Sequence, residues 1–168
     1  MPANQNTSDI NVREIIPLMP PEELKKELPI SDASENTVLQ SRRTIQNILD
    51  KKDERLLAIV GPCSIHDTKA ALDYAKKLKN LRDKVSDRIE LMMRVYFEKP
   101  RTTVGWKGLI TDPQIDGQDD VANGIYTARD LLLKITAMGL PTGTEFLEPI
   151  VPQYLSDVVS WAAIGART

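Results

Sequence analysis

The 168-residue chain has a single cysteine, a single histidine and no long apolar segment. One cysteine, Cys63, excludes a disulfide within the chain. One histidine, His66, excludes a metal site built from several histidines of this chain. The longest purely apolar stretch runs only from Leu56 to Val60, far short of the roughly 20 residues that a membrane-spanning helix needs.

The chain also lacks an excess of positive charge, because 22 basic residues face 24 acidic ones and the net charge is −2. This balance excludes a generally basic nucleic-acid-binding protein. The first ten residues have neither a basic start nor an apolar centre, so they do not form a secretory signal. Together with the low cysteine content, this predicts a cytoplasmic protein, with neither a membrane nor a nucleic acid among its partners.

Residues 1–33 are polar and interrupted by prolines, which predicts an N-terminal arm without a core of its own. Residues 21–28 can form a short helix within it, since a proline comes first and acidic residues follow. We expect Ser34 to cap the next helix, whose apolar residues recur at helical spacing. Residues 34–168 then form the folded domain.

After residue 55 the pattern alternates between short apolar strands and amphipathic helices. The predicted strands are Leu56–Val60, Ile89–Phe97, Thr142–Phe146 and Trp161–Ala166, and the predicted helices cover residues 67–86, 120–138 and 152–160. Such alternation predicts an α/β fold with a parallel sheet and helical crossovers. The continuous apolar run of the first strand indicates burial on both of its faces.

In parallel α/β folds, functional sites gather at the carboxyl ends of the strands. In this sequence, those ends carry Cys63, Arg94, Lys99, Glu145 and Arg167. We therefore expect these side chains, which come from four different strands, to meet at one edge of the sheet.

Arg94 lies on the second strand, where Ile89 to Phe97 place apolar residues at every other position. Because side chains alternate between the faces of a strand, Arg94 lies on the face away from the helices. A buried arginine needs an anionic partner. An ion pair with Glu90 or Glu145 and a site for an anionic ligand explain the position equally well.

The segment from Arg94 to Lys107 carries four cations and one acid, within a chain that is acidic overall. It suits a phosphate or a carboxylate, although a solvated loop explains it more simply when it is considered alone. Cys63 is either a small buried residue or a metal ligand or nucleophile. His66 follows three residues later, but two ligands do not make a metal site, and a histidine at a helix start is the simpler interpretation.

Three motifs together resemble one family, the first-class 3-deoxy-D-arabino-heptulosonate 7-phosphate (DAHP) synthases. They are Gly61-Pro62-Cys63-Ser64-Ile65-His66-Asp67, Lys99-Pro100-Arg101-Thr102-Thr103-Val104-Gly105-Trp106-Lys107-Gly108 and Gly165-Ala166-Arg167-Thr168. The second motif is the most specific. Residues 152–157 and the N-terminal arm also fit the family.

The resemblance implies a TIM (β/α)8 barrel, of which this chain would form the N-terminal half, about four β/α units, preceded by an arm and a helix. It also implies an activity. Such an enzyme condenses phosphoenolpyruvate with erythrose 4-phosphate and water and releases phosphate, as the first step of aromatic amino acid biosynthesis. The missing second half would carry further substrate cations and metal ligands, so the chain alone is expected to be inactive.

The resemblance also gives roles to particular residues. Arg94 and Lys99 would be catalytic residues that bind the carboxylate of phosphoenolpyruvate. The phosphoenolpyruvate site would also include Glu145, Ala166 and Arg167, and erythrose 4-phosphate would meet Pro100, Arg101 and Thr102. Cys63 would be a ligand of a divalent metal ion.

Two partners follow from the same resemblance, namely an aromatic amino acid that inhibits the enzyme and further copies of the chain in a homo-oligomer. The arm and residues 147–157 would take part in both. Two alternatives stay open: a related phosphoenolpyruvate-dependent sugar-acid phosphate synthase, and a non-catalytic α/β module that binds a phosphorylated ligand.

Overall fold

The computed structural model describes residues 10, 12, 15–100 and 104–165. Its elements follow in the order α1 (Pro21–Glu27), α2 (Asp32–Leu49), β1 (Leu56–Val60), α3 (Thr68–Val85), β2 (Ile89–Arg94), α4 (Val121–Ala137), β3 (Thr142–Phe146), α5 (Val151–Leu155), the 3-10 helix η1 (Ser156–Val158) and β4 (Trp161–Ile164). This confirms the predicted alternation of strands and helices after residue 55.

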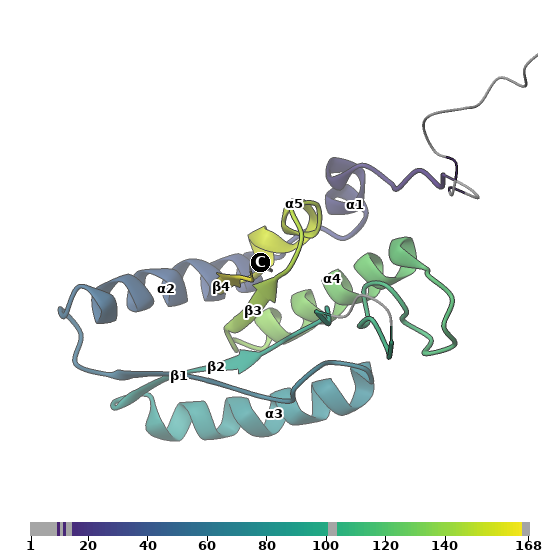
Figure 1. Ribbon diagram of the computed structural model, residues 1–168. Coiled ribbons are helices and arrows are strands. Elements are labelled where there is room, and N and C mark those ends of the chain that lie inside the picture. The colour runs from purple at the N-terminus through teal and green to yellow at the C-terminus, as the bar shows by residue number, and fades with distance from the viewer. Residues whose placement is uncertain (1–9, 11, 13–14, 101–103, 166–168) are drawn as a thin grey trace, which may run out of the picture.

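The four strands form one parallel sheet in the order β1-β2-β3-β4. Leu56 pairs with Ile89, and Met93 with Thr142. The strand direction turns steeply from β1 and β2 to β3 and β4, so the sheet curls into a half-barrel (Figure 1). The predicted α/β class and half-barrel architecture are confirmed. All four carboxyl ends lie at the same edge, since every pair is parallel.

The crossover helices are positioned by caps and by apolar stripes. Asp67 caps α3, because its carboxylate accepts hydrogen bonds from Lys69 N at 2.8 Å and Ala70 N at 3.0 Å. The buried stripe of α3, which includes Ala75 and Leu78, packs against β2. Asp120 caps α4 in the same way. The helices thus cover the apolar face of β2 that the alternation predicted.

The prediction that Ser34 caps the second helix is wrong. The helix α2 begins at Asp32, and its N-cap is Ser31, whose side chain accepts from Ser34 N at 3.2 Å. Ser34 is buried, and its hydroxyl donates to Leu133 O on α4 at 3.2 Å. Both serines suit a cap, and only the start of the helix decides between them.

Helix α2 packs where strands begin. Ser41 donates to the carboxylate of Glu90 near the start of β2, and Arg42 donates to Val159 O just before β4. The opposite edge of the sheet, where the strands end, is left to the loops.

Strand β1 differs from its prediction. Leu56 is 66% exposed and Ile59 is 36% exposed, although burial on both faces was expected. β1 is one of the two outer strands of the sheet and has a neighbouring strand, β2, on one side. An apolar run indicates that a strand can be buried, but it does not show which elements cover it.

Three predicted boundaries also shift. β2 ends at Arg94 and not at Phe97, because its pairing with β3 covers only two positions. The expected helix 152–160 divides into α5 and η1. β4 is assigned to Trp161–Ile164, and the predicted last residue, Ala166, lies outside the described residues.

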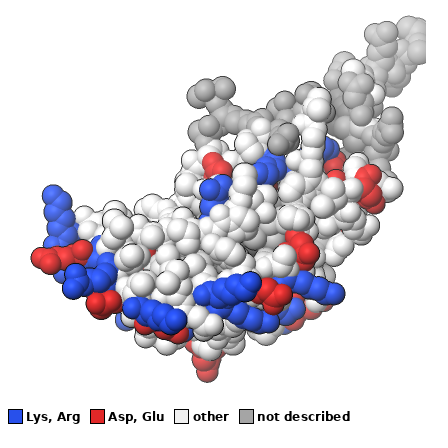
Figure 2. Space-filling model, turned by 90° about the horizontal axis from the view of Figure 1, so that it is seen from below, with Lys and Arg blue, Asp and Glu red and all other residues white. Residues whose placement is uncertain are grey.

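The surface shows no single-sign patch on the face in Figure 2, where Lys and Arg side chains lie beside Asp and Glu. Ion pairs on α3, such as Lys79 with Asp83 at 2.6 Å, are of this kind. Within the described part of the chain, no helix is both long and apolar enough to cross a membrane.

Candidate active site

The carboxyl edge of the sheet carries most of the predicted site residues that the structure describes. Cys63 is exposed in the loop after β1, and Arg94 is the last residue of β2. Lys99 follows in the loop after β2, and Glu145 lies in β3, one residue before its end. The parallel pairing places all of them at the same edge.

Three of these residues are brought into contact. Arg94 Nη2 donates to Cys63 O at 3.3 Å, and Lys99 Nζ donates to Cys63 Sγ at 3.2 Å. Two cations from β2 and the following loop therefore meet the cysteine that follows β1. The contact joins the ends of two of the four strands, whereas among the described residues Glu145 forms no hydrogen bond or ion pair with Arg94 or Lys99, and Arg167 lies outside the described part of the chain.

Arg94 has much of its hydrogen-bonding capacity left for a ligand. Its guanidinium lies 4.1 Å from the centre of the Tyr96 ring, and its Nε is buried without a hydrogen-bond partner among the described residues. Such unpaired donors are costly unless something else binds them. An anion is the partner that this chemistry calls for.

The alternative explanation for Arg94, an ion pair with Glu90, is wrong. Glu90 is 2% exposed, and its carboxylate instead binds Arg55 at 3.4 Å and Arg82 at 3.2 Å. Within the described residues, Arg94 forms no ion pair with Glu145 either. Of the two interpretations that the sequence left open, the ion pair is thus absent among the described residues, and the ligand site stays a prediction.

Two glycines of the quoted motifs, to which no role was assigned from the sequence, let the site close. A Cβ at Gly61 would lie 2.6 Å from Arg94 O, and a Cβ at Gly165 would lie 2.6 Å from Glu145 Oε1. Each glycine directly follows an apolar strand, which is the sequence signal that could have identified them.

The loop after β2 folds back on itself. Lys99 N donates to Lys107 O at 2.9 Å, and Ile110 N donates to Phe97 O at 3.3 Å. Gly108 has φ +107°, and a Cβ there would lie 2.4 Å from Phe97 O, so only glycine fits. Lys99 is thus held at the base of a closed loop, with Pro100 exposed beside it.

Glu98, which the sequence did not single out, is a partly buried carboxylate between two site loops. Its Oε2 accepts from Leu147 N at 3.3 Å, and so joins the loop after β2 to the loop after β3. Burial raises the pKa of the Glu98 carboxyl to about 6. The negative charges of Glu148 and Glu145 add to this increase in pKa, whereas the hydrogen bond from Leu147 opposes it.

Other predicted positions cannot be assigned a geometry. Arg101, Thr102, Ala166 and Arg167 lie outside the described residues. For a metal ion, the described residues contain no group of three or more His, Cys, Asp or Glu side chains suitably placed to hold one. Cys63 is exposed at the strand ends, and the ring of His66 meets that of Trp106.

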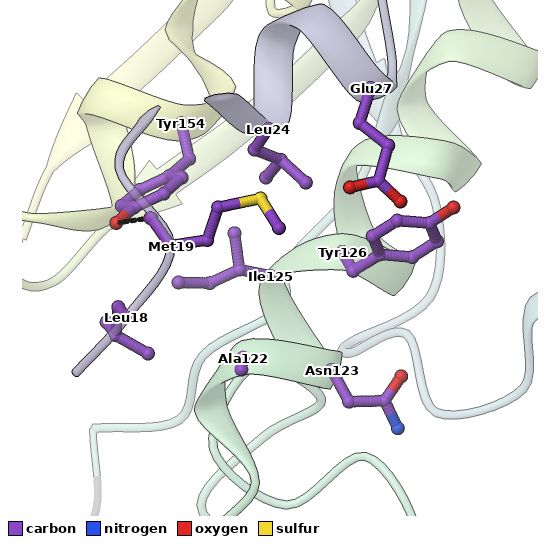
Figure 3. Close-up of a pocket in the computed structure, with 9 residues that line it drawn as sticks. All are labelled: Leu18, Met19, Leu24, Glu27, Ala122, Asn123, Ile125, Tyr126 and Tyr154. Carbon is purple, nitrogen blue, oxygen red and sulfur yellow. Dashed lines mark hydrogen bonds between the residues drawn. The ribbon is translucent and has the colours of Figure 1, made fainter. Parts of the chain in front are cut away.

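A separate apolar hollow of about 260 Å³ lies between the arm, α1, α4 and α5 (Figure 3). Leu24 and Ile125 form part of its wall, and Tyr154 closes one side by donating to Met19 O at 2.7 Å. None of the strand-end residues lines it, so it is distinct from the cluster around Cys63.

Comparison with known proteins gives consistent matches. Residues 27–168 match the model of the DAHP synthetase I family. A Phe-sensitive phospho-2-dehydro-3-deoxyheptonate aldolase of Escherichia coli K12 is 51% identical over 165 residues, which are 98% of this chain and 47% of that relative. A Tyr-sensitive aldolase of the same strain is 53% identical over 161 residues, 96% of this chain and 45% of that relative.

A solved structure agrees with these sequence matches. The structure of phospho-2-dehydro-3-deoxyheptonate aldolase from Francisella tularensis SCHU S4 superimposes with a TM-score of 0.90 at 48% identity. The superposition covers 94% of this chain and 46% of the chain of the Francisella tularensis protein. The chain therefore spans about half the length of these relatives.

Proposed function

This chain belongs to the DAHP synthetase I family, and from that premise we propose that it supplies the phosphoenolpyruvate-binding half of a DAHP synthase. The enzyme condenses phosphoenolpyruvate with erythrose 4-phosphate and water to give DAHP and phosphate. The observation that carries the proposal is the cluster of Cys63, Arg94 and Lys99, in which Arg94 Nε is left without a partner among the described residues.

Arg94 and Lys99 suit the carboxylate of phosphoenolpyruvate. A guanidinium binds a planar carboxylate through two parallel hydrogen bonds, and a lysine adds a point charge. The ring of Tyr96 beneath the Arg94 guanidinium fixes the plane in which it presents its donors. We place the phosphate of the same substrate near Glu145, Ala166 and Arg167, and erythrose 4-phosphate at Pro100, Arg101 and Thr102.

Cys63 is the residue in the described part of the chain that would hold a divalent metal ion. Its sulfur accepts a hydrogen bond from the Lys99 ammonium at 3.2 Å, and cysteine binds metal ions as a thiolate. One thiolate is not a complete site, so further donors must come from outside the described residues. When bound, such an ion polarises the aldehyde carbonyl or activates the water.

The remaining contribution of the chain is to bring the reactants together. The enol carbon of phosphoenolpyruvate must meet the aldehyde carbon while water is otherwise excluded. The loop after β2, which is closed by the bond from Lys99 N to Lys107 O, begins with Lys99. The residues proposed to contact erythrose 4-phosphate directly follow Lys99 in the sequence, so this loop would position both substrates.

Regulation and assembly extend the proposal. The relatives named Phe-sensitive and Tyr-sensitive support an aromatic amino acid as effector. We propose that residues 1–33 form an arm for contacts with another copy of the chain and with the effector, and that residues 34–168 belong to the barrel. A homo-oligomer in the cytoplasm completes the proposal.

The test uses the complete protein, by which we mean this chain with everything else that its gene encodes. Phosphate release is measured with phosphoenolpyruvate, a divalent metal and either erythrose 4-phosphate or arabinose 5-phosphate. Turnover with erythrose 4-phosphate but not with arabinose 5-phosphate supports the proposal. Turnover with arabinose 5-phosphate would favour a sugar-acid phosphate synthase, and binding of phosphoenolpyruvate without turnover would favour a binding module.

Two substitutions then test the site itself. Arg94→Ala and Cys63→Ala should nearly abolish turnover in a folded protein. Arg88→Ala is the matched control, since Arg88 is an exposed cation just before the other end of β2. Near-normal rates for Arg94→Ala or Cys63→Ala would overturn the roles given to these residues.

A further inference from the structure

Trp106, which belongs to the motif from Lys99 to Gly108, makes two directed contacts. Its indole Nε1 donates to Asp112 O at 2.7 Å. Its ring and the ring of His66 form an edge-to-face pair, in which the two ring planes are at 89° and the centroids lie 6.5 Å apart. The residue therefore touches both the loop after β1 and the distal part of the loop after β2.

The acceptor of the indole bond is held in a compact turn. Asp112 is 5% exposed, and its N–H donates to Gly108 O at 2.9 Å. Its carboxylate accepts from Asp116 N and Gly117 N, both at 3.1 Å. Trp106 is thus attached to a turn that has little freedom to shift.

A short chain of bonds leads from Trp106 to the site. The next residue, Lys107, accepts from Lys99 N at 2.9 Å through its carbonyl. Lys99 in turn reaches Cys63 Sγ with its ammonium at 3.2 Å. Any displacement of Trp106 therefore moves the backbone that carries Lys99.

The other contact of Trp106 leads to the same place. His66 belongs to the loop that contains Cys63, and its neighbour Ile65 is fixed by a bond from its N–H to Tyr96 O at 2.9 Å. The His66 ring thus projects from a segment whose backbone is bonded to the residues that follow β2, and Trp106 contacts this ring. Through it, the loop of Lys99 is set against the loop of Cys63.

We propose that Trp106, resting on His66, is a positioning residue that holds the Lys99 ammonium at the place where the carboxylate of phosphoenolpyruvate binds. Neither ring touches the substrate. The inference rests on the proposed function, which supplies the ligand. If Trp106 only filled space, its replacement would lower stability and leave the affinity of the folded protein unchanged. A positioning role instead lowers the affinity of a protein that is still folded.

The experiment measures the dissociation constant of phosphoenolpyruvate by titration calorimetry on the complete protein. Trp106→Phe removes the indole donor, and His66→Ala removes the ring contact at an exposed position. Each should weaken binding about three- to tenfold, since an aromatic pair or one hydrogen bond is a modest interaction. Trp161→Phe, in the partly exposed second tryptophan at the start of β4, is the matched control and should bind as the parent does.

A double substitution tests whether Trp106 acts through Lys99. In a Lys99→Ala background, Trp106→Phe should cause no further loss of affinity. An equal loss in both backgrounds, or binding within twofold of the parent for both Trp106→Phe and His66→Ala, would overturn the inference. If Trp106→Phe does not fold, His66→Ala decides. A parent protein that does not bind phosphoenolpyruvate at all would instead overturn the proposed function, and this inference with it.

Discussion

Glu98 should make the protein less stable as the pH rises through the range where this carboxyl ionises. The carboxyl is partly buried, faces the negative charges of Glu148 and Glu145, and has a pKa raised from 4.5 to about 6. Folding therefore disfavours its charged form. The penalty is absent well below pH 4.5, develops between pH 4.5 and 6, and is complete above pH 6. Glu98→Gln keeps an oxygen that can accept from Leu147 N and removes the charge.

The size of the effect follows from the shift in pKa. A shift from 4.5 to about 6 corresponds to about 2 kcal/mol when the penalty is complete. Between pH 5 and pH 7.5 the linkage relation gives about 1.2 kcal/mol of this penalty. Because part of the carboxyl still faces water, which screens it, we expect about 1 kcal/mol.

The assay is urea unfolding of the complete protein at pH 5 and at pH 7.5, for the parent and for Glu98→Gln. At each pH, the free energy of unfolding of the parent is subtracted from that of Glu98→Gln. This difference should be about 1 kcal/mol more favourable to the variant at pH 7.5 than at pH 5. Glu54→Gln is the matched control, because Glu54 is exposed, and its difference from the parent should not change with pH. An equal difference for Glu98→Gln at both pH values, or a larger one at pH 5, would refute the reasoning.

Three further substitutions test contacts elsewhere. Gly165→Ala would place a methyl group 2.6 Å from Glu145 Oε1, so turnover should fall roughly ten- to hundredfold, and unchanged steady-state kinetics would contradict this. Arg129→Leu should lower the free energy of unfolding by about 3 kcal/mol, measured in urea, because Arg129 is 0% exposed and binds the Asp157 carboxylate at 2.8 and 2.9 Å. Ser31→Ala should cost about 1 kcal/mol in the same assay, whereas Ser31→Asp, which still caps α2, should cost little.

The sequence predicted the strands best where local signals agree. The bounds of β1 and β3 match the structure: the apolar run of β1 lies between Arg55 and Gly61, and β3 begins directly after Pro141. It also predicted that Cys63, Arg94 and Lys99 would meet, since parallel strands end at one edge. These successes depend on features that a few neighbouring residues encode.

Features that depend on distant contacts could not be predicted. The exposure of β1 depends on which strands lie beside it, and not on its own apolar residues. The raised pKa of Glu98 depends on burial and on acidic residues some 50 positions later. The capping serine of α2 was ambiguous, because two serines three residues apart both suit a cap and only Ser34 also meets α4.

Glu90 and Arg94 show how one strand face is divided between stability and binding. They lie four residues apart on β2, and therefore on the same face. Glu90, near the amino end, is 2% exposed and is bonded by Arg55, Arg82 and Ser41, so its charge is fully paired within the fold. A buried carboxylate with this many donors contributes to structure and leaves nothing for a ligand.

Arg94, at the carboxyl end of β2, has far fewer partners for its charged group than Glu90 has. Among the described residues, its guanidinium donates one hydrogen bond, of 3.3 Å, to a carbonyl and lies over an aromatic ring, while its Nε is buried without a hydrogen-bond partner. The same strand therefore carries a carboxylate surrounded by donors and, among the described residues, an arginine that forms no ion pair. The complete pairing of Glu90 and the incomplete pairing of Arg94 support the proposal that the carboxyl end of β2 binds an anionic ligand.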